Sequence, residues 1–404
     1  MGMWEIVRAN KNKSLVLACL MAVLLLALGF LIAEAIQQGA GYAGLAVAGG
    51  VWALMALISY FQGGRLLMAS AGAKQITPDM HPQLFNVVEE MVIASGMKKT
   101  PDVYIIDSMD MNAFATGRDP EHAAVAVTAG LLARLNRDQL QGVIAHEISH
   151  IVNRDILFMT MLGVMLGAIV MASELFLRGM RFSALGPRRS RSSSQGGGQA
   201  QVIFAILALV MAIVAPIAAQ IIYFAASRRR EYLADASAVV LTRYPEGLAS
   251  ALEALGTAQR SPREYAGRAT APMFIVNPLA ARGAVGLFST HPPIEQRVRI
   301  LRGLGGTGEV SYSAYEQAWS SAEGRKGALL PQTALASAAV PTRLSSDAES
   351  PGRRKQTREA YDSVRQAHGY RIVACGCGAR MKLPPSTTDR TWACPRCGRP
   401  LQTG

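Results

Sequence analysis

One short motif in the sequence has the residue types and spacing of a hydrolytic metal site. His146 and His150 flank Glu147 in an H-E-x-x-H pattern. Residues four apart share one face of a helix, so both imidazoles can reach one metal ion while the glutamate lies beside it. Zinc in such a site takes three protein ligands and a water, whose pKa falls to about 7. The motif therefore predicts a zinc site in which Glu147 activates the metal-bound water; the alternative is a helix whose histidines are only packed or solvated.

An acidic pair further along the chain could supply the third metal ligand. Glu231 and Asp235 are four residues apart, directly after a long apolar stretch. On a helix they share a face, so Glu231 could ligate zinc while Asp235 orients a ligand histidine from behind. The alternative is the basic flank of a membrane helix. That alternative explains the arginines at 228–230 but not the acid pair.

Four cysteines near the C-terminus form a second candidate metal site. Cys375 and Cys377 make one pair, and Cys394 and Cys397 make another. Four thiolates can surround one zinc ion tetrahedrally, and the adjacent glycines permit the tight turns required. The pattern resembles a structural zinc ribbon, although the first pair has one intervening residue where two are usual. A disulfide pairing is the weaker alternative, because the orientation argued below places this segment in a reducing compartment.

The elements that must position the first motif can be read from the apolar residues around it. Residues 137–153 have helical periodicity and predict the helix that carries both histidines. Upstream, residues 84–92 repeat at helical spacing, and the β-branched runs 103–106 and 123–127 predict strands. The order helix, strand, strand, helix predicts a small α+β unit.

Four apolar stretches account for the composition of the chain. Its 404 residues are 50% hydrophobic and only 17% charged, which argues against a disordered chain and an ordinary cytosolic enzyme. The stretches are residues 15–33, 43–61, 156–173 and 202–226. At about 1.5 Å per residue, the first reaches about 28 Å, close to the thickness of a bilayer core. We predict an integral membrane protein. The alternatives are a cleaved signal peptide for the first stretch and buried core helices for the last two.

Basic residues in the short flanks predict the orientation. They precede the first stretch and follow the second, and the turn between has none (Arg8, Lys11, Lys13, Arg65 and Lys74). By the positive-inside rule, the N-terminus and residues 62–155 should face the cytoplasm. Residues 178–201 disagree, because they carry five arginines and would lie outside if the last two stretches both span. Either this loop is translocated against its charge or that pair does not fully cross.

Several separated segments together resemble the HtpX-type membrane metalloproteases, which are related to the CAAX prenyl proteases. The shared features are the H-E-x-x-H helix followed by Asn-Arg-Asp, an N-A-F-A-T-G segment from Asn112, an R-R-E-Y-x-A-D segment ending at Asp235, and an S-T-H-P-P turn around His291. The resemblance covers about residues 1–303. It implies a gluzincin fold in which His146, His150 and Glu231 bind zinc and Glu147 is the general base.

The resemblance also bears on substrate binding and catalysis. It implies that a strand near Asn112, Ala113 and Phe114 pairs with an extended polypeptide substrate. The developing oxyanion needs a donor beyond the metal. His291, in the turn before a predicted helix at 294–301, is the candidate donor; the alternative is a capping histidine without a role at the zinc.

The predicted architecture is mainly α and membrane-embedded, with four apolar helices, a cytoplasmic α+β catalytic domain of gluzincin type and a small C-terminal β zinc ribbon. We predict an N-terminal transmembrane hairpin over residues 1–62, a metalloprotease domain over 63–303 that includes apolar helices 156–177 and 202–226, a flexible linker over 304–371, and the ribbon over 372–404. The linker is predicted because this stretch is rich in Ala, Ser and Arg and has little apolar periodicity.

These features predict a membrane-bound zinc endopeptidase acting on misfolded or membrane proteins, with one catalytic and one structural zinc. A role in protein quality control and stress response is implied by the resemblance. The expected location is the plasma (inner) membrane, with the catalytic domain and both termini in the cytoplasm. The expected partners are polypeptide substrates and the lipid bilayer; no motif predicts specific nucleic-acid binding, and the oligomeric state is left open. The alternative is a membrane-anchored zinc-binding adaptor with an idle protease site. Prenylated-protein processing is a weaker enzymatic alternative, because nothing in the chain recognises an isoprenoid.

Overall fold

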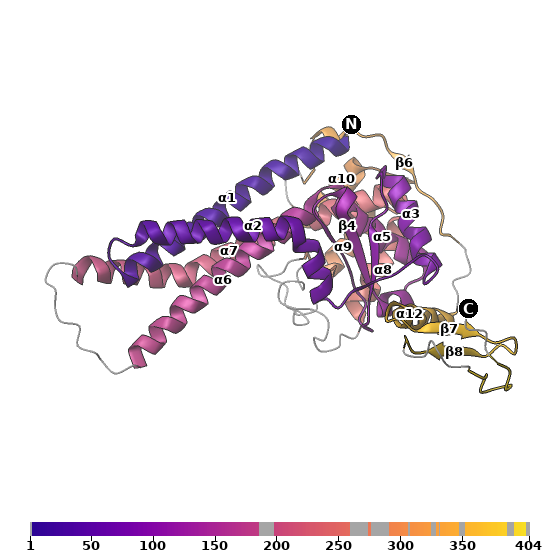
Figure 1. The fold of residues 1–404 in the computed structure, drawn as a ribbon. Coiled ribbons are helices and arrows are strands. Elements are labelled where there is room, and N and C mark those ends of the chain that lie inside the picture. The colour runs from indigo at the N-terminus through magenta and orange to yellow at the C-terminus, as the bar shows by residue number, and fades with distance from the viewer. Residues whose placement is uncertain are drawn as a thin grey trace.

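Four long helices form an arm that projects from a mixed α/β unit (Figure 1). The structure is a computed structural model that describes residues 2–185, 198–258, 274–275, 291–305, 308–324, 329–330, 332–346, 352–385 and 392–400. The arm contains α1 (Gly2–Ile36), α2 (Gly41–Ser70), α6 (Asp155–Leu185) and α7 (Gly198–Thr242). Each of the four is long and apolar enough to cross a bilayer.

The burial pattern of the arm is that of a membrane bundle. A narrow internal core includes Leu28, Leu162 and Ala215. Large aliphatic side chains on the outer faces stay exposed, with Leu15 at 65% and Leu54 at 59%. A soluble protein would cover such a surface, whereas lipid tails solvate it. The prediction of four apolar membrane helices is therefore confirmed. The centre of the arginine-rich loop, residues 186–197, lies outside the described residues.

Small residues allow α1 and α2 to pack closely. A Cβ atom added at Gly29 would lie 2.6 Å from the Cβ of Ala48. The turn between the helices is closed by Glu34, whose carboxylate accepts hydrogen bonds from the backbone N–H groups of Gly39 and Gly41 at 2.8 and 2.7 Å. Close contact through small residues is a common way for helices to associate in lipid.

A four-stranded sheet lies at the centre of the α/β unit. Its order is β1 (Lys74–Gln75), β2 (Asp102–Ile106), β4 (Ala123–Thr128) and β3 (Ala113–Gly117). Strands β2 and β4 are parallel, whereas β3 is antiparallel to β4 and forms the edge. The two predicted strands and the predicted α+β unit are confirmed. The pattern of apolar residues did not indicate β1 or β3.

Helix α5 (Arg137–Val152) carries the H-E-x-x-H motif. Its first turn is fixed by a capping box, in which the Asn136 side chain accepts from the N–H of Gln139 and the Gln139 side chain accepts from the N–H of Asn136. The helix ends before Arg154, which has a left-handed φ of 56°. This tight turn lets α6 begin immediately at Asp155, so the motif helix and a membrane helix meet beside His150.

Five shorter helices surround α5 or follow it. Helix α3 (Pro82–Ser95) and helix α8 (Pro245–Thr257) pack on its sides. Gly142 permits the close approach of α8, because a Cβ there would lie 2.6 Å from the backbone nitrogen of Leu248. The others are α4 (Ala129–Arg134), the 3-10 turn η1 (Pro120–His122) and α9 (Ile294–Gly303).

The prediction of a flexible linker over residues 304–371 is wrong. This stretch contains α10 (Tyr312–Glu323), α11 (Gln332–Leu335) and α12 (Arg353–Ala367), with the short strand pair β5 (Glu309–Val310) and β6 (Val340–Pro341). Tyr312, Tyr315 and Trp319 are buried in the main core. Their spacing of three and four residues places them on one helix face, a pattern that the surrounding Ala- and Ser-rich composition hides.

Residues 308–346, which we call the strap, are attached to the first turn of the motif helix. Arg343 pairs with Asp138 at 2.9 Å, and the hydroxyls of Ser345 and Ser346 donate to the same carboxylate at 2.8 and 2.7 Å. Helix α12 then packs on α4, and its Asp362 forms salt bridges with the C-terminal hairpin. That hairpin is β7 (Arg371–Ala374) and β8 (Arg380–Leu383). The segment after residue 303 is therefore part of the folded unit.

Candidate metal centre

Helices α5 and α7 bring three potential metal ligands together. The Nε2 atoms of His146 and His150 lie 3.2 Å apart, and their rings meet edge to face. Glu231 lies on the extension of the fourth apolar stretch, and each of its two carboxylate oxygens lies 3.5 Å from one of these nitrogens. The three candidate ligand atoms lie within 4.8 Å of one another, and the side chains are buried or nearly so.

A carboxylate lies behind each of the two imidazoles. Asp235 lies 3.0 Å from Nδ1 of His146, and Asp155 lies 3.4 Å from Nδ1 of His150. Because each carboxylate can accept an Nδ1 proton, each Nε2 can present its lone pair to a metal ion that takes the place of the Nε2 proton. Two imidazole nitrogens and a carboxylate converge on one point, an arrangement that a bound cation stabilises. The nitrogen and oxygen donor set fits zinc with three protein ligands.

The same carboxylates make His150 a strong base. Burial by itself lowers the pKa of His150, but hydrogen bonds to Asp155 and Glu231 outweigh that effect and raise the pKa to about 10. A carboxylate behind the ring makes the electron pair on Nε2 more basic, and a more basic electron pair binds a metal ion more tightly. Asp155 belongs to the Asn-Arg-Asp segment after the motif, but its contact with His150 was not predicted from the sequence.

Arg297, on α9, is a second residue that sequence reasoning did not single out. It is fully buried, and its Nε donates to Asp235 at 2.8 Å while its Nη1 lies 3.2 Å from Glu231. A buried guanidinium is stable only when carboxylates compensate its charge. The available signal was an arginine on the same face of the predicted helix 294–301 as Val298 and Leu301, which are buried with it.

Glu147 lies between the candidate ligands and the edge of the sheet. It is only 2% exposed, and burial raises its pKa, which the neighbouring His146 and His150 lower in part. The backbone N–H of Ala115 in β3 hydrogen-bonds its carboxylate. The carboxylate therefore stands beside both the histidine pair and the outward edge of β3.

The predicted substrate-pairing residues lie at this edge. Ala113 begins β3, and its carbonyl oxygen accepts a hydrogen bond from the N–H of Ile275 at 3.0 Å. Phe114 is fully buried, with its ring edge-to-face against Phe274 at a centroid distance of 4.8 Å. Asn112 precedes the strand and accepts from the N–H of Thr128. Two outward backbone groups of the edge, the carbonyl of Ala113 and the N–H of Ala115, are therefore taken by the chain itself.

His291 lies close to the candidate ligands. Its Nδ1 is 2.9 Å from Oε2 of Glu231, in the turn that leads into α9. Residues 289 and 290 of the S-T-H-P-P segment lie outside the described residues. The contact brings a potential hydrogen-bond donor to the side of the cluster formed by Glu231.

The four C-terminal cysteines also converge. The sulfur atoms of Cys375 and Cys397 are 3.5 Å apart, and those of Cys377 and Cys394 are 3.6 Å apart. All four lie within 4.8 Å of one another. The turn after each pair contains a glycine with positive φ (Gly378 at 82° and Gly398 at 69°). The single residue between Cys375 and Cys377 therefore does not prevent a four-sulfur cluster.

Comparisons with known proteins identify a matching family and several relatives. The family model described as Peptidase family M48 matches residues 78–304. A protein named Protease HtpX homolog from Thermoanaerobacter pseudethanolicus is 41% identical over 302 residues, which cover 75% of this chain and 98% of that protein. A protein of the same name from Caldanaerobacter subterraneus is 42% identical over 304 residues, which cover 75% of this chain and 98% of that protein. The crystal structure of S. mikatae Ste24p aligns with a TM-score of 0.40 and 21% identity over 74% of this chain and 66% of that one.

Proposed function

The chain belongs to peptidase family M48, and from that premise we propose that it is a membrane-bound zinc endopeptidase whose catalytic zinc is held by His146, His150 and Glu231. The observation that carries the proposal is the convergence of two imidazole nitrogens and one carboxylate, with a further carboxylate behind each imidazole. A helix with merely packed histidines has no need of a third acidic group from a distant helix.

Each residue of the site has a role in peptide hydrolysis. When bound, zinc supplies a Lewis acid that polarises the peptide carbonyl and acidifies a water. Glu147 takes a proton from the attacking water and passes it to the leaving amine, and its raised pKa suits a base that works near neutral pH. Asp235 and Asp155 keep the imidazole protons on Nδ1. His291 donates a hydrogen bond to the developing oxyanion.

The edge of β3 is the proposed binding site for an extended substrate. Ala113 and Ala115 direct backbone groups away from β4, and the second of them contacts Glu147. A peptide that pairs with this edge by β-augmentation would pass the general base. Because Glu231 is on a helix that continues from the membrane arm, we propose that the substrates are membrane or misfolded polypeptides presented at the membrane surface.

The proposed topology follows from the basic flanks. The N-terminus, the catalytic unit and the C-terminal cysteines face the cytoplasm, and all four apolar helices cross the plasma membrane. In that compartment the cysteines stay reduced and can hold a second, structural zinc.

Substitution of Glu147→Gln tests the catalytic proposal. We expect zinc content to be retained and cleavage of casein, or of a membrane-protein substrate, to be lost, because the amide cannot accept the proton. The matched control is Glu89→Gln, an exposed glutamate on α3 that should leave turnover unchanged. Turnover by the Glu147→Gln variant at the wild-type rate would remove the enzyme proposal. Absence of chelator-sensitive cleavage by the wild-type protein would favour the adaptor alternative.

A further inference from the structure

A pocket of about 510 Å³ lies between α2 and the sheet, away from the candidate metal centre. Helix α2 contributes Tyr60, Phe61, Gly64 and Arg65, and strands β2, β3 and β4 form the opposite wall. We call it the α2–sheet pocket. Its polar lining consists of Arg65, Lys99, Asp102, Tyr104, Thr116 and Arg118, with His122 at the side.

The pocket lies at the depth where lipid headgroups are found. From Gly41 to Phe61, α2 spans about 30 Å at about 1.5 Å per residue, which is the thickness of a bilayer core. Tyr60 and Phe61 end this apolar stretch and are 43% and 59% exposed. Aromatic residues of this kind favour the boundary between tails and headgroups. Arg65 lies one helical turn further on, so the pocket opens at the interface whichever way the protein is oriented.

The charge of the lining favours an anion. Three cationic side chains face one carboxylate, that of Asp102. Arg65 forms no salt bridge with another described residue. Lys99 uses one ammonium hydrogen for the carbonyl of Glu121 at 2.9 Å and has two more to donate. The guanidinium of Arg118 lies 5.8 Å from the ring centre of Tyr60, and the same group contacts Asp119.

A buried hydroxyl gives an independent indication of a ligand. Thr116 on β3 is 1% exposed, and its Oγ1 has no hydrogen-bond partner among the described residues. Its side chain faces α2, where the absence of a side chain at Gly64 leaves room. Buried polar atoms in native proteins nearly always have a partner, so an unpaired hydroxyl in a cationic pocket indicates a bound acceptor.

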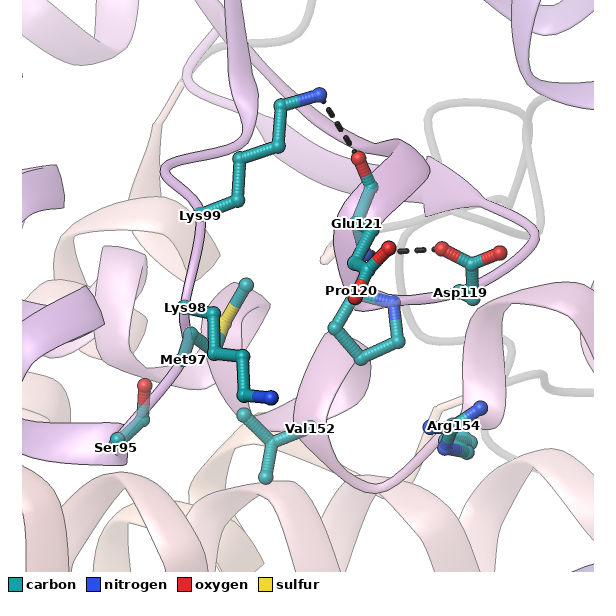
Figure 2. Close-up of a pocket in the computed structure, with 10 residues that line it drawn as sticks. Ser95, Met97, Lys98, Lys99, Asp119, Pro120, Glu121, Val152 and Arg154 are labelled. Atoms are coloured by element: carbon teal, nitrogen blue, oxygen red, sulfur yellow. Dashed lines mark hydrogen bonds between the residues drawn. The ribbon is translucent and has the colours of Figure 1, made fainter.

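A neighbouring pocket lacks these features. Figure 2 shows Lys99 reaching the carbonyl of Glu121 while Lys98 extends in the opposite direction, in a pocket that Arg154 also lines. Its lining contains two carboxylates, Asp119 and Glu121, beside three cations, and includes no orphaned buried hydroxyl among the described residues. Lys98 is therefore a matched control for charge removal at the same surface.

We propose that the α2–sheet pocket binds the phosphate headgroup of an anionic phospholipid. Arg65, Lys99 and Arg118 donate to the phosphate oxygens, and Thr116 donates its hydroxyl. A free phosphate offers the same oxygens, but the pocket borders the exposed apolar face of α2, where Leu54 and Leu57 can contact acyl chains. The bound lipid would tie α2 to β3, the strand that contacts Glu147.

Native mass spectrometry of the full chain in detergent tests this proposal, with phosphatidylglycerol and phosphatidylcholine of the same acyl chains as probes. We expect one phosphatidylglycerol to be retained at least tenfold more tightly than phosphatidylcholine. The Arg65→Gln/Arg118→Gln variant should lose this preference, and Lys98→Gln should keep it. Thr116→Val, which preserves strand packing, should weaken retention even if the double variant folds poorly.

Three results would overturn the proposal. Equal retention of the two lipids would show that the protein does not select anionic phospholipids. Unchanged preference in well-folded variants of Arg65, Arg118 and Thr116 would place the lipid elsewhere. Displacement of phosphatidylglycerol by millimolar inorganic phosphate would identify a soluble phosphate, not a lipid, as the ligand.

Discussion

Each candidate imidazole ligand is held at its far nitrogen by a carboxylate from a different membrane helix. Asp235 on α7 holds His146, and Asp155 at the start of α6 holds His150. Arg297 in turn joins Asp235 to Glu231. The three proposed ligands are therefore positioned by charged side chains behind them, those of Asp155, Asp235 and Arg297. A bound metal ion would contribute to the charge balance of this cluster. Loss of one member should affect both metal affinity and stability.

Asp155→Ala should weaken zinc binding by about ten- to a hundredfold, because His150 loses the acceptor that fixes its proton on Nδ1. Competition between the purified protein and a chromophoric chelator measures this affinity. The exposed Asp107 provides the control substitution, Asp107→Ala, which should bind zinc as the wild type does. Equal zinc affinities for the two variants would show that the 3.4 Å contact has no role in metal binding.

Arg297→Leu should be strongly destabilising. The substitution leaves the buried carboxylate of Asp235 without its compensating charge, and breaking such a pair typically costs about 3–5 kcal/mol. Thermal unfolding in detergent measures the change. Arg302→Gln on the same helix is the comparison, because its salt bridges with Glu246 and Glu253 are exposed to solvent and such pairs contribute little to stability. Similar melting temperatures for both variants would contradict the proposed burial effect.

At the scale of elements, the site depends on one helix that is fixed at both ends. The capping box at Asn136 starts α5, and the turn at Arg154 joins it to α6. Gly142 lets α8 pack within backbone contact of the same helix. The strap adds Arg343, Ser345 and Ser346 around Asp138, in the first turn, where a carboxylate also interacts favourably with the helix dipole.

Acidification should release the strap. Burial raises the pKa of Asp138, but hydrogen bonds from Ser346, Ser345 and Arg343 outweigh this and leave its pKa below the usual value. A carboxyl whose folded pKa is depressed contributes stability that is full above its unfolded pKa of about 3.9 and is lost as pH falls through the folded value. We therefore expect protection of the strap at neutral pH and its loss below about pH 4.

Limited proteolysis with pepsin at acidic pH and with trypsin at neutral pH, followed by mass spectrometry, locates cleavage in the strap. Asp138→Asn should expose the strap at pH 7 as strongly as acid does in the wild type. Asp79→Asn, which changes an exposed carboxylate, should not. Full protection of the strap in Asp138→Asn would contradict the role of the charge.

At the scale of the whole molecule, helices α6 and α7 connect the membrane arm directly to the proposed catalytic unit. Helix α6 begins at the residue that holds His150, and α7 is one continuous helix of 45 residues that carries Glu231 where it extends beyond the arm. A change in the tilt of either helix in the bilayer therefore moves a group that contacts the proposed zinc ligands. The zinc ribbon is connected more locally, through the salt bridges of Asp362 with Arg380 and Lys382.

Metal analysis should find two zinc ions per chain. Cys375→Ser/Cys394→Ser should remove one of them and leave casein cleavage intact, because the two candidate clusters share no element. Cys19→Ser changes a cysteine in the first apolar helix and should leave both ions in place. One zinc per wild-type chain, retained when the ribbon is deleted, would remove the prediction of a second zinc site.

Local patterns in the sequence were sufficient to predict the apolar helices, the two central strands and the group His146, Glu147 and His150. The reason is that each depends on spacing within one element, either the length of an apolar run or a separation of four residues on a helix. Glu231 was singled out by its separation of four residues from Asp235 after an apolar stretch, whereas β3 was identified only because its segment resembles a known family. The residues of the short strand β3 do not alternate between apolar and polar, so their pattern does not identify it as a strand.

Only the tertiary structure showed the role of Arg297, the contact of Asp155 with His150, and the folded strap. Each depends on where separate elements meet: α9 against α7, the start of α6 beside α5, and residues 343–346 against Asp138. A buried charge is stable only through partners far away in the chain, and no local spacing encodes them. The strap was mispredicted for the same reason, since Tyr315 and Trp319 become core residues only when another element covers them.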